Sequence, residues 1–242
     1  MKTVPIILAA ATLLCITCLT AVATAQNPEL QQKVAAIKQS AAQNKQALAQ
    51  YTWVEQVTIS LKGEQKKQEH FQVRLGPDGK PQKTSLDPPP APEAASDSGG
   101  KRGGRLKEHV VEKKKEEYKD YADQIKELIQ KYVPPEKDLL EQAFQQGNIK
   151  AGPVAGSAGQ YSLVISNYVK KGDDMTVLID AAQKELSSVS INSYLDDPKD
   201  AVKVTVQFAK IPDGPNHVTS QTIEGVSKQL TISIENSKYQ KI

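Results

Sequence analysis

Cysteine is almost absent from this sequence of 242 residues, and both copies, Cys15 and Cys18, lie among the first 25 residues. Their CxxC spacing would suit a redox or metal site. The surrounding segment is apolar, however, and the sequence has no second cysteine pair to complete a zinc site. Removal of 25 of the 242 residues would leave 217 residues without cysteine, so we expect the fold to form without disulfides.

Aromatic residues and net charge are also scarce. Phe, Trp and Tyr together make up 5% of the residues, and 31 basic residues face 28 acidic ones for a net charge of +3. Nucleic-acid-binding proteins normally carry a concentrated basic stripe, which this balance excludes. We therefore expect no nucleic-acid partner.

No catalytic motif is found in the sequence. The stretch Gly156–Gly159 has the residue types of a nucleophile elbow in the wrong register, and Gly99–Lys101 lacks the Ser or Thr that a phosphate-binding loop needs. The three histidines, His70, His109 and His217, have no metal-ligand spacing, and we expect them to face solvent. The sequence thus predicts no enzyme, no catalytic residue, no metal site and no cofactor.

The first 25 residues are typical of an export signal. Lys2 precedes an apolar run from Ile6 to Leu19, and Ala23-Thr24-Ala25 fits the small-x-small rule of signal peptidases. We predict cleavage after Ala25, a single domain over residues 26–242, and a periplasmic or secreted location without a stable membrane span.

The apolar N-terminal segment has two alternative interpretations, a membrane anchor and a lipoprotein signal. The stretch from Val4 to Ala25 is long enough to remain as a membrane anchor, although the cleavage site argues against it. A lipoprotein would need a small residue before the modified cysteine, and Leu14 and Thr17 occupy those positions.

The hydrophobic pattern changes period along the chain. Asn27-Pro28 is a good helix start, and apolar residues follow at helical spacing until about Tyr51. Alternation at period two then predicts strands over Tyr51–Lys62 and Lys67–Leu75 and a short third strand near Lys83.

The middle of the chain predicts a loop and two helices. Residues 87–105 are rich in proline and glycine and cannot bury a core, so we expect a disordered surface loop. A long charged helix is predicted from Leu106 to Tyr132 and a second one from Glu136 to Gln146, with Gly147 as its C-cap. The apolar stripes of these helices include Tyr121, Ile125, Leu128, Leu139, Leu140 and Phe144.

The last third of the chain alternates in a way that predicts one continuous antiparallel sheet with one apolar face. The acidic pairs Asp173-Asp174 and Asp196-Asp197 fall at turns, where aspartate bonds to the local backbone, and further turns are expected at Pro212–Gly214 and Glu224-Gly225. The alternating residues are Tyr161, Leu163, Ile165, Met175, Val177, Ile179, Val189, Ile191, Val202, Val204, Val206, Phe208, Leu230, Ile232 and Ile234.

The order of helix, three strands, two helices and many strands resembles the periplasmic lipoprotein carriers LolA and LolB and their lipoprotein-sorting relatives. The stretches that carry the likeness are Tyr51-Thr52-Trp53, Asp173–Asp180, Leu186–Leu195 and Ile234–Tyr239. The resemblance implies an α+β fold in which a curved antiparallel sheet forms an incomplete β-barrel, covered by the N-terminal helix and the two inserted helices. It also implies an apolar cavity that receives the acyl chains of lipids or lipoproteins. No family arginine or lid residue matches a position here, so no functional residue is carried over.

The inner face of such a sheet and the helical stripes opposite it would line the cavity. The expected lining residues are Trp53, Val202, Val204, Val206, Phe208, Leu230, Ile232, Ile234, Tyr121, Ile125, Leu128 and Phe144. If the helices fill the cavity completely, the same pattern is simply a core. The alternative is then an envelope protein that binds another protein, without transport of a ligand.

Overall fold

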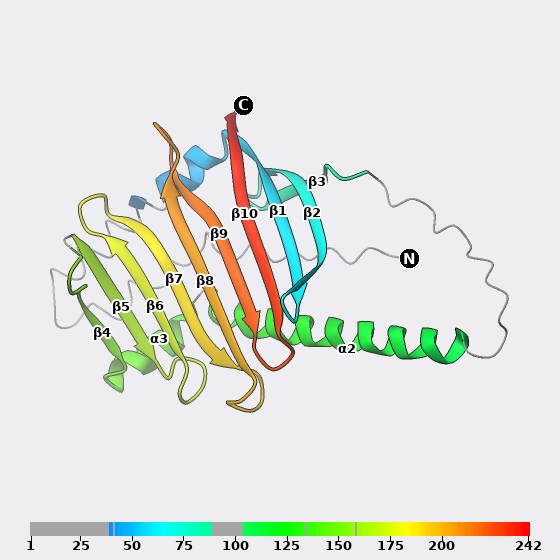
Figure 1. The fold of residues 1–242 in the computed structure, drawn as a ribbon. Helices are drawn as coiled ribbons and strands as arrows, with labels where there is room; N and C mark the ends of the chain where they lie inside the picture. The colour runs from blue at the N-terminus through cyan, green and yellow to red at the C-terminus, as the bar shows by residue number, and fades with distance from the viewer. Residues whose placement is uncertain (1–38, 41, 89–103, 134, 158) are drawn as a thin grey trace.

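The chain folds around one open sheet of ten antiparallel strands, in the order β3-β2-β1-β10-β9-β8-β7-β6-β5-β4 (Figure 1). The structure is a computed structural model, and it describes residues 39–40, 42–88, 104–133, 135–157 and 159–242. The predicted α+β class, with an open curved sheet and helices on it, is confirmed.

The elements follow one another as two meanders with a helical insertion between them. The first meander comprises β1 (Tyr51–Leu61), β2 (Glu64–Leu75) and β3 (Pro81–Ser85), and the insertion comprises α2 (Gly104–Gln130) and α3 (Lys137–Gln145). The second meander comprises β4 (Ile149–Pro153), β5 (Gln160–Ser166), β6 (Asp174–Asp180), β7 (Glu185–Tyr194), β8 (Ala201–Lys210), β9 (Asn216–Gly225) and β10 (Leu230–Lys241).

The two meanders are joined by the pairing of β1 with β10. Tyr51 lies opposite Lys241 at one end of this pair and Leu61 opposite Leu230 at the other, with a register shift between Thr52 and Val54. All other neighbours in the sheet are consecutive along the chain, so β3 and β4 form its two free edges.

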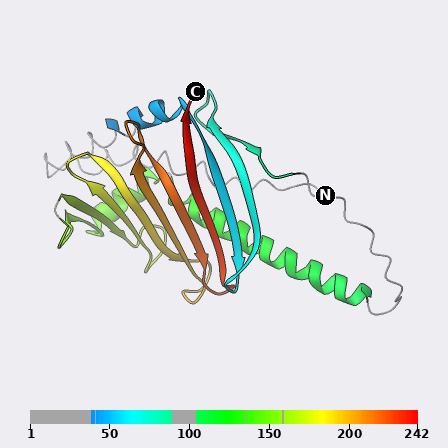
Figure 2. The same cartoon turned by 45° about the horizontal axis from the view of Figure 1, so that its top comes forward.

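One face of the sheet is apolar, as the period-two alternation predicts. On β8 the side chains of Val202, Val204 and Val206 are buried, whereas Lys203 and Gln207 are exposed and Thr205 is half-buried. Helices α2 and α3 lie on the buried face and complete the larger of two hydrophobic clusters (Figure 2).

A second, smaller cluster lies at the other end of the strands. A helix described at residues 39–40 and 42–48 places Leu48 against Trp53, Val73 and Ile211. The N-terminal helix and α2 therefore cover opposite ends of the sheet (Figure 1).

Helix α3 ends where the sequence predicts. Gly147 has φ +70°, the left-handed conformation that glycine adopts without strain, and its amide donates to the Phe144 carbonyl. The amide of Asn148 then reaches back to the Ala143 carbonyl, 2.8 Å away, so the chain turns directly into β4.

Two strands were not predicted. β4 has five residues and a single large aliphatic side chain, Ile149. β9 buries the polar residues Asn216, His217 and Gln221, so it lacks the apolar alternation of the other strands. The turn expected at Glu224-Gly225 lies slightly later, at 226–229, because both residues still belong to β9.

Some predictions concern residues outside the described ranges. These are the signal peptide over residues 1–25, the predicted start of the N-terminal helix, and residues 89–103 of the predicted loop. Residues 104 and 105, which the loop prediction included, instead begin α2. Among the helices in the described ranges, none combines the length and the apolar character needed to cross a membrane.

Candidate ligand-binding face of the sheet

Three rows of residues cross the inner face of the sheet from β8 through β9 and β10 to β1. In the middle row Val204 pairs with Ile223, Ile223 with Ile232, and Ile232 with Ile59. Because cross-strand neighbours on one face are in contact, these rows form a continuous aliphatic floor. The two flanking rows are Val202, Gly225, Leu230 and Leu61 on one side and Val206, Gln221, Ile234 and Val57 on the other.

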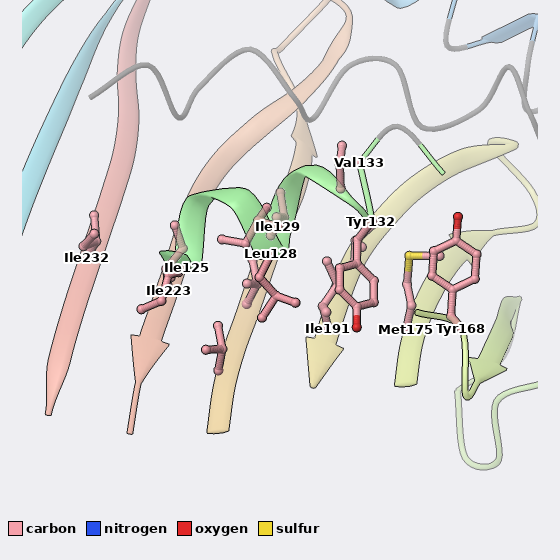
Figure 3. Close-up of a cluster of buried hydrophobic side chains, with 14 of the residues drawn as sticks. Ile125, Leu128, Ile129, Tyr132, Val133, Tyr168, Met175, Ile191, Ile223 and Ile232 are labelled. Carbon is pink, nitrogen blue, oxygen red and sulfur yellow. The ribbon is translucent and has the colours of Figure 1, made fainter. Parts of the chain in front are cut away.

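Helix α2 covers this floor with one continuous stripe. The predicted residues Tyr121, Ile125 and Leu128 are 2–4% exposed. Ile129 on α2 and Tyr132 in the turn after it are also buried, although they are not among the predicted lining residues. Figure 3 shows Ile125 next to Ile223 of β9, and Tyr132 near Ile191 of β7 and Met175 of β6. Phe144 on α3 and Phe208 on β8 are only partly buried and pack at the margin of the cluster.

The helix approaches the sheet closely at Gly225. A Cβ atom at this position would lie 2.5 Å from Cε1 of Tyr121 and 2.8 Å from Cδ1 of Ile125. The glycine therefore allows α2 to rest directly on the backbone of β9.

Two tyrosines fasten α2 to the sheet through their hydroxyl groups. Tyr121 donates to Asp200 Oδ1 at 2.8 Å and accepts from Ser227 at 3.1 Å, which ties the helix to the turns before β8 and before β10. Burial is the main cause that raises the pKa of Tyr121, with Asp200 adding to it. One turn earlier on the surface, Glu117 forms an ion pair with Lys228.

The second tyrosine contact is deeper. Tyr132 is fully buried, and its hydroxyl donates to Asp173 Oδ2 at 2.5 Å and accepts from Ser193 at 2.7 Å. Burial and then the Asp173 carboxylate raise the pKa of Tyr132 well above its usual value. The two contacts of Tyr121 and Tyr132, which we call the tyrosine latches, hold the covering stripe of α2 at both ends.

Asp173 also fixes the connection from β5 to β6. Its carboxylate is 2% exposed and accepts from the backbone amides of Tyr168, Val169 and Lys170 at 2.6–2.9 Å. The predicted role of this aspartate in turn formation is thus the one observed. In the described part of the chain, no three His, Cys, Asp or Glu side chains gather as metal ligands do.

Trp53 does not lie on the aliphatic floor with the other predicted lining residues. On β1 the inward positions run from Val57 through Glu55 to Trp53, so a buried carboxylate separates the tryptophan from the floor. Trp53 belongs to the second cluster and stacks on Tyr239 with ring centroids 5.7 Å apart.

A band of polar side chains crosses the inner face between the two clusters. Glu55 pairs with Lys83 of β3 in an ion pair in which the glutamate side chain is 2% exposed and the lysine side chain 21%. Glu55 lies directly opposite Asn236 of β10. We call Glu55, Lys83, Asn236 and the adjoining His217 and Tyr239 the polar band.

His217 departs from the expected solvent-facing position. His217 is buried, with its ring centroid 4.1 Å from that of Tyr239, and burial lowers its pKa. His70 is half-buried, and its Nδ1 atom lies 2.9 Å from Oδ1 of Asp87. The side chain of His109 lies outside the described part of the structure.

A surface pocket of about 540 Å³ lies beside the cover, between α3 and the connection from β5 to β6. Apolar and polar side chains both line it. The ammonium group of Lys170, one of the lining residues, donates hydrogen bonds to the Tyr194 and Leu195 carbonyls. The lining residues are Leu139, Gln142, Ala143, Gln146, Asn148, Asn167, Tyr168, Val169, Lys170 and Lys171.

Comparison with known proteins finds similarity only at the level of structure. No family model matches the sequence, and no curated protein matches it. A crystal structure of a DUF1329 family protein from Desulfovibrio piger aligns with 12% identity and a TM-score of 0.38, covering 86% of this chain and 92% of that one. A LolA superfamily protein from Nitrosomonas europaea aligns with 7% identity and a TM-score of 0.36 over the same shares. The second of these structures carries the name of the superfamily that the sequence resembles, and its structural similarity to this chain is distant.

Proposed function

We propose that this chain is an exported binding or carrier protein that holds the acyl chains of a lipid or lipoprotein on the inner face of its sheet. The observation that carries the proposal is the aliphatic floor closed by a single helical layer. That layer is inserted between β3 and β4 and is fastened by the tyrosine latches. A periplasmic or secreted location and a role in binding in place of catalysis are parts of the same proposal.

The energies of the closed and the loaded state are comparable. Four side chains of α2, Tyr121, Ile125, Leu128 and Ile129, are buried in the larger hydrophobic cluster. At about 1.5–3 kcal/mol for each large apolar side chain, their contacts represent about 6–12 kcal/mol. An acyl chain of roughly 16 carbons offers about 13 kcal/mol at ~0.8 kcal/mol per methylene. A chain can therefore replace α2 on the floor without a large net cost.

Opening requires the helix to leave the sheet, so a covalent tether across that contact should prevent binding. Glu117 on α2 and Lys228 in the turn before β10 form an exposed ion pair, with side chains 57% and 32% exposed. Cysteines at these two positions can be joined by a short cleavable bismaleimide linker, because the protein has no cysteine after residue 18. We expect the tethered protein to lose saturable binding of a fluorescent fatty-acyl probe and to regain it after linker cleavage.

The matched control places the same linker within one hairpin. Glu64 and Lys66, also an exposed ion pair, both belong to the start of β2, so a linker between them does not join α2 to the sheet. The control tether should leave probe binding unchanged. Equal binding by the free and the tethered Glu117–Lys228 variant would show that the helix does not open for the ligand. No saturable binding by the wild-type protein would refute the acyl-binding function itself.

A second candidate function is binding of another envelope protein. It is favoured by the long helix α2 (Figure 1), in which the described side chains from Lys113 to Asp120 are exposed or half-buried and the first described buried one is Tyr121. Native mass spectrometry of the protein purified from the periplasm separates the two, since the first predicts co-purified lipid and the second a bound polypeptide.

A further inference from the structure

Three polar atoms in and beside the polar band are buried without a hydrogen-bond partner among the described residues. They are Nε1 of Trp53, Nδ1 of His217 and Oδ1 of Asn236. Trp53 and His217 are themselves 7% and 6% exposed. A buried polar group without a partner costs free energy, so three of them in one place indicate a group that is still to be bound.

All three side chains gather around Tyr239. The Trp53 ring stacks on it, the His217 ring meets it edge-on at 4.1 Å, and the amide of Asn236 shares its acceptor. This acceptor is the Val218 carbonyl, which receives Nδ2 of Asn236 at 3.0 Å and the Tyr239 hydroxyl at 3.1 Å. Because that carbonyl can only accept, the orientation of the Asn236 amide is fixed and its free atom is an acceptor.

The free atoms define what they can bind. The indole N–H of Trp53 only donates, and the amide oxygen of Asn236 only accepts. A matching group must therefore offer both an acceptor and a donor, as a hydroxyl does. A carboxylate or a phosphodiester offers acceptors alone and would leave Asn236 unsatisfied.

The charge of the polar band favours the same choice. Its single lysine, Lys83, is already paired with Glu55 and lies over the Phe71 ring at 5.7 Å. An anion entering here would lose its hydration and come close to the buried Glu55 carboxylate. It would find no free cation in the band, because Lys83 is already paired with Glu55.

The position of the band matches the proposed acyl site. Glu55 and Asn236 lie directly next to Val57 and Ile234, the last row of the aliphatic floor. On the other side lies the second cluster, which the N-terminal helix covers through Leu48. An amphipathic molecule with its chain on the floor would have its polar end at the band, between the two covers.

We propose that the polar band is a headgroup site for an uncharged, hydroxyl-bearing acyl lipid of the acylglycerol or glycolipid type, with Trp53 donating to the headgroup and Asn236 accepting from it. This proposal rests on the proposed acyl-binding function and specifies its ligand class.

The test compares three ligands with the same chain on the full-length mature protein, each displacing the same fluorescent acyl probe. Monopalmitoylglycerol carries free hydroxyls, methyl palmitate carries only acceptors, and palmitate is an anion. With about fivefold in affinity for each hydrogen bond, wild-type protein should bind monopalmitoylglycerol at least about fivefold more tightly than the other two ligands, because neither of them can donate to Asn236. In Asn236→Leu this preference should be lost, whereas Trp53→Phe should weaken all three ligands together, because each of them offers an acceptor to the indole N–H.

The three ligands are compared with one another on each variant. Partial unfolding of a variant therefore lowers all three apparent affinities together and leaves their ratio unchanged. Leu48→Ala is the matched control, since it weakens the second cluster and removes no polar partner. It should retain the full preference. Equal affinities in the wild type, a preference for palmitate, or the same loss of preference in Leu48→Ala would each overturn the headgroup site while leaving acyl binding intact. No displacement by any ligand would overturn both proposals.

Discussion

The close approach of α2 to Gly225 allows a sharp test of the covering helix. Replacing Gly225 with alanine adds a Cβ atom 2.5 Å from Cε1 of Tyr121 and 2.8 Å from Cδ1 of Ile125, which is closer than such atoms can come. Neither neighbour can simply rotate away, because both side chains are buried at 4% and 2% exposure. Overpacking of this kind costs about 1–3 kcal/mol of unfolding free energy.

The steric conflict lies between the cover and the sheet, so it should act on opening as well as on stability. A cost of about 1.4 kcal/mol in the closed state would raise the population of the open state about tenfold. We expect Gly225→Ala to lower the urea midpoint and, in stopped-flow mixing, to increase the association rate of the acyl probe.

Two controls separate this mechanism from a general effect of alanine. Gly152 on the edge strand β4 has no atom within 4 Å of the position that a Cβ atom would occupy, so Gly152→Ala should change stability by less than about 0.5 kcal/mol. In a Tyr121→Ala background the added methyl group of Gly225→Ala has room, and its cost should largely vanish in a double-mutant cycle. A full cost that persists without Tyr121, or a slower association in Gly225→Ala, would refute the reasoning.

Two further predictions concern buried titratable groups. Tyr132→Phe removes the hydroxyl that donates to Asp173 alongside three backbone amides. We expect the free energy of unfolding, measured in urea, to fall by about 1.5–3 kcal/mol. A change below about 0.5 kcal/mol would contradict the role of the Tyr132 contact. Burial lowers the pKa of His217 from 6.5. Below pH 6.5 the unfolded chain therefore binds a proton at His217 that the folded chain does not bind, so the free energy of unfolding falls as the pH drops. His217→Phe keeps a ring against Tyr239 and should flatten the decline of the melting temperature between about pH 6.5 and 5, and an unchanged slope would count against a neutral buried histidine.

Much of the aliphatic floor could be predicted from the sequence because it obeys one simple rule. Val202, Val204 and Val206 alternate with Lys203 and Gln207, and this period of two assigns them to one face before any tertiary contact is known. The stripe of α2 follows from helical spacing in the same way. Local periodicity therefore suffices for the floor and its cover.

The polar band could not be predicted by the same rule, because its members come from four strands and most interrupt the apolar pattern. Gln221 and His217 point inward on β9, so the strand lacks the alternation that would reveal it. One feature of the sequence does indicate the band. Glu55 lies two residues from both Trp53 and Val57, so the alternation of β1 places its carboxylate on the inner face. Its partner Lys83 follows only from the pairing of β1 with β2 and of β2 with β3.

The tyrosine latches lie beyond the reach of any local pattern. Tyr121 bonds to Asp200 across 79 residues of sequence, and Tyr132 bonds to Ser193 across 61. Only the return of the second meander toward β1 brings these partners together, and that return depends on the whole sheet.

The pairing of β1 with β10 has a consequence for the order in which the protein folds. Tyr51 and Lys241 are neighbours in space although nearly the whole described sequence separates them, whereas every other strand pair is a local hairpin. Local hairpins lose little chain entropy on closure and form early, while this pairing must wait for the longest loop to close. The two meanders should thus collapse as separate units, and the floor, which draws its rows from both, becomes complete only in the final docking step.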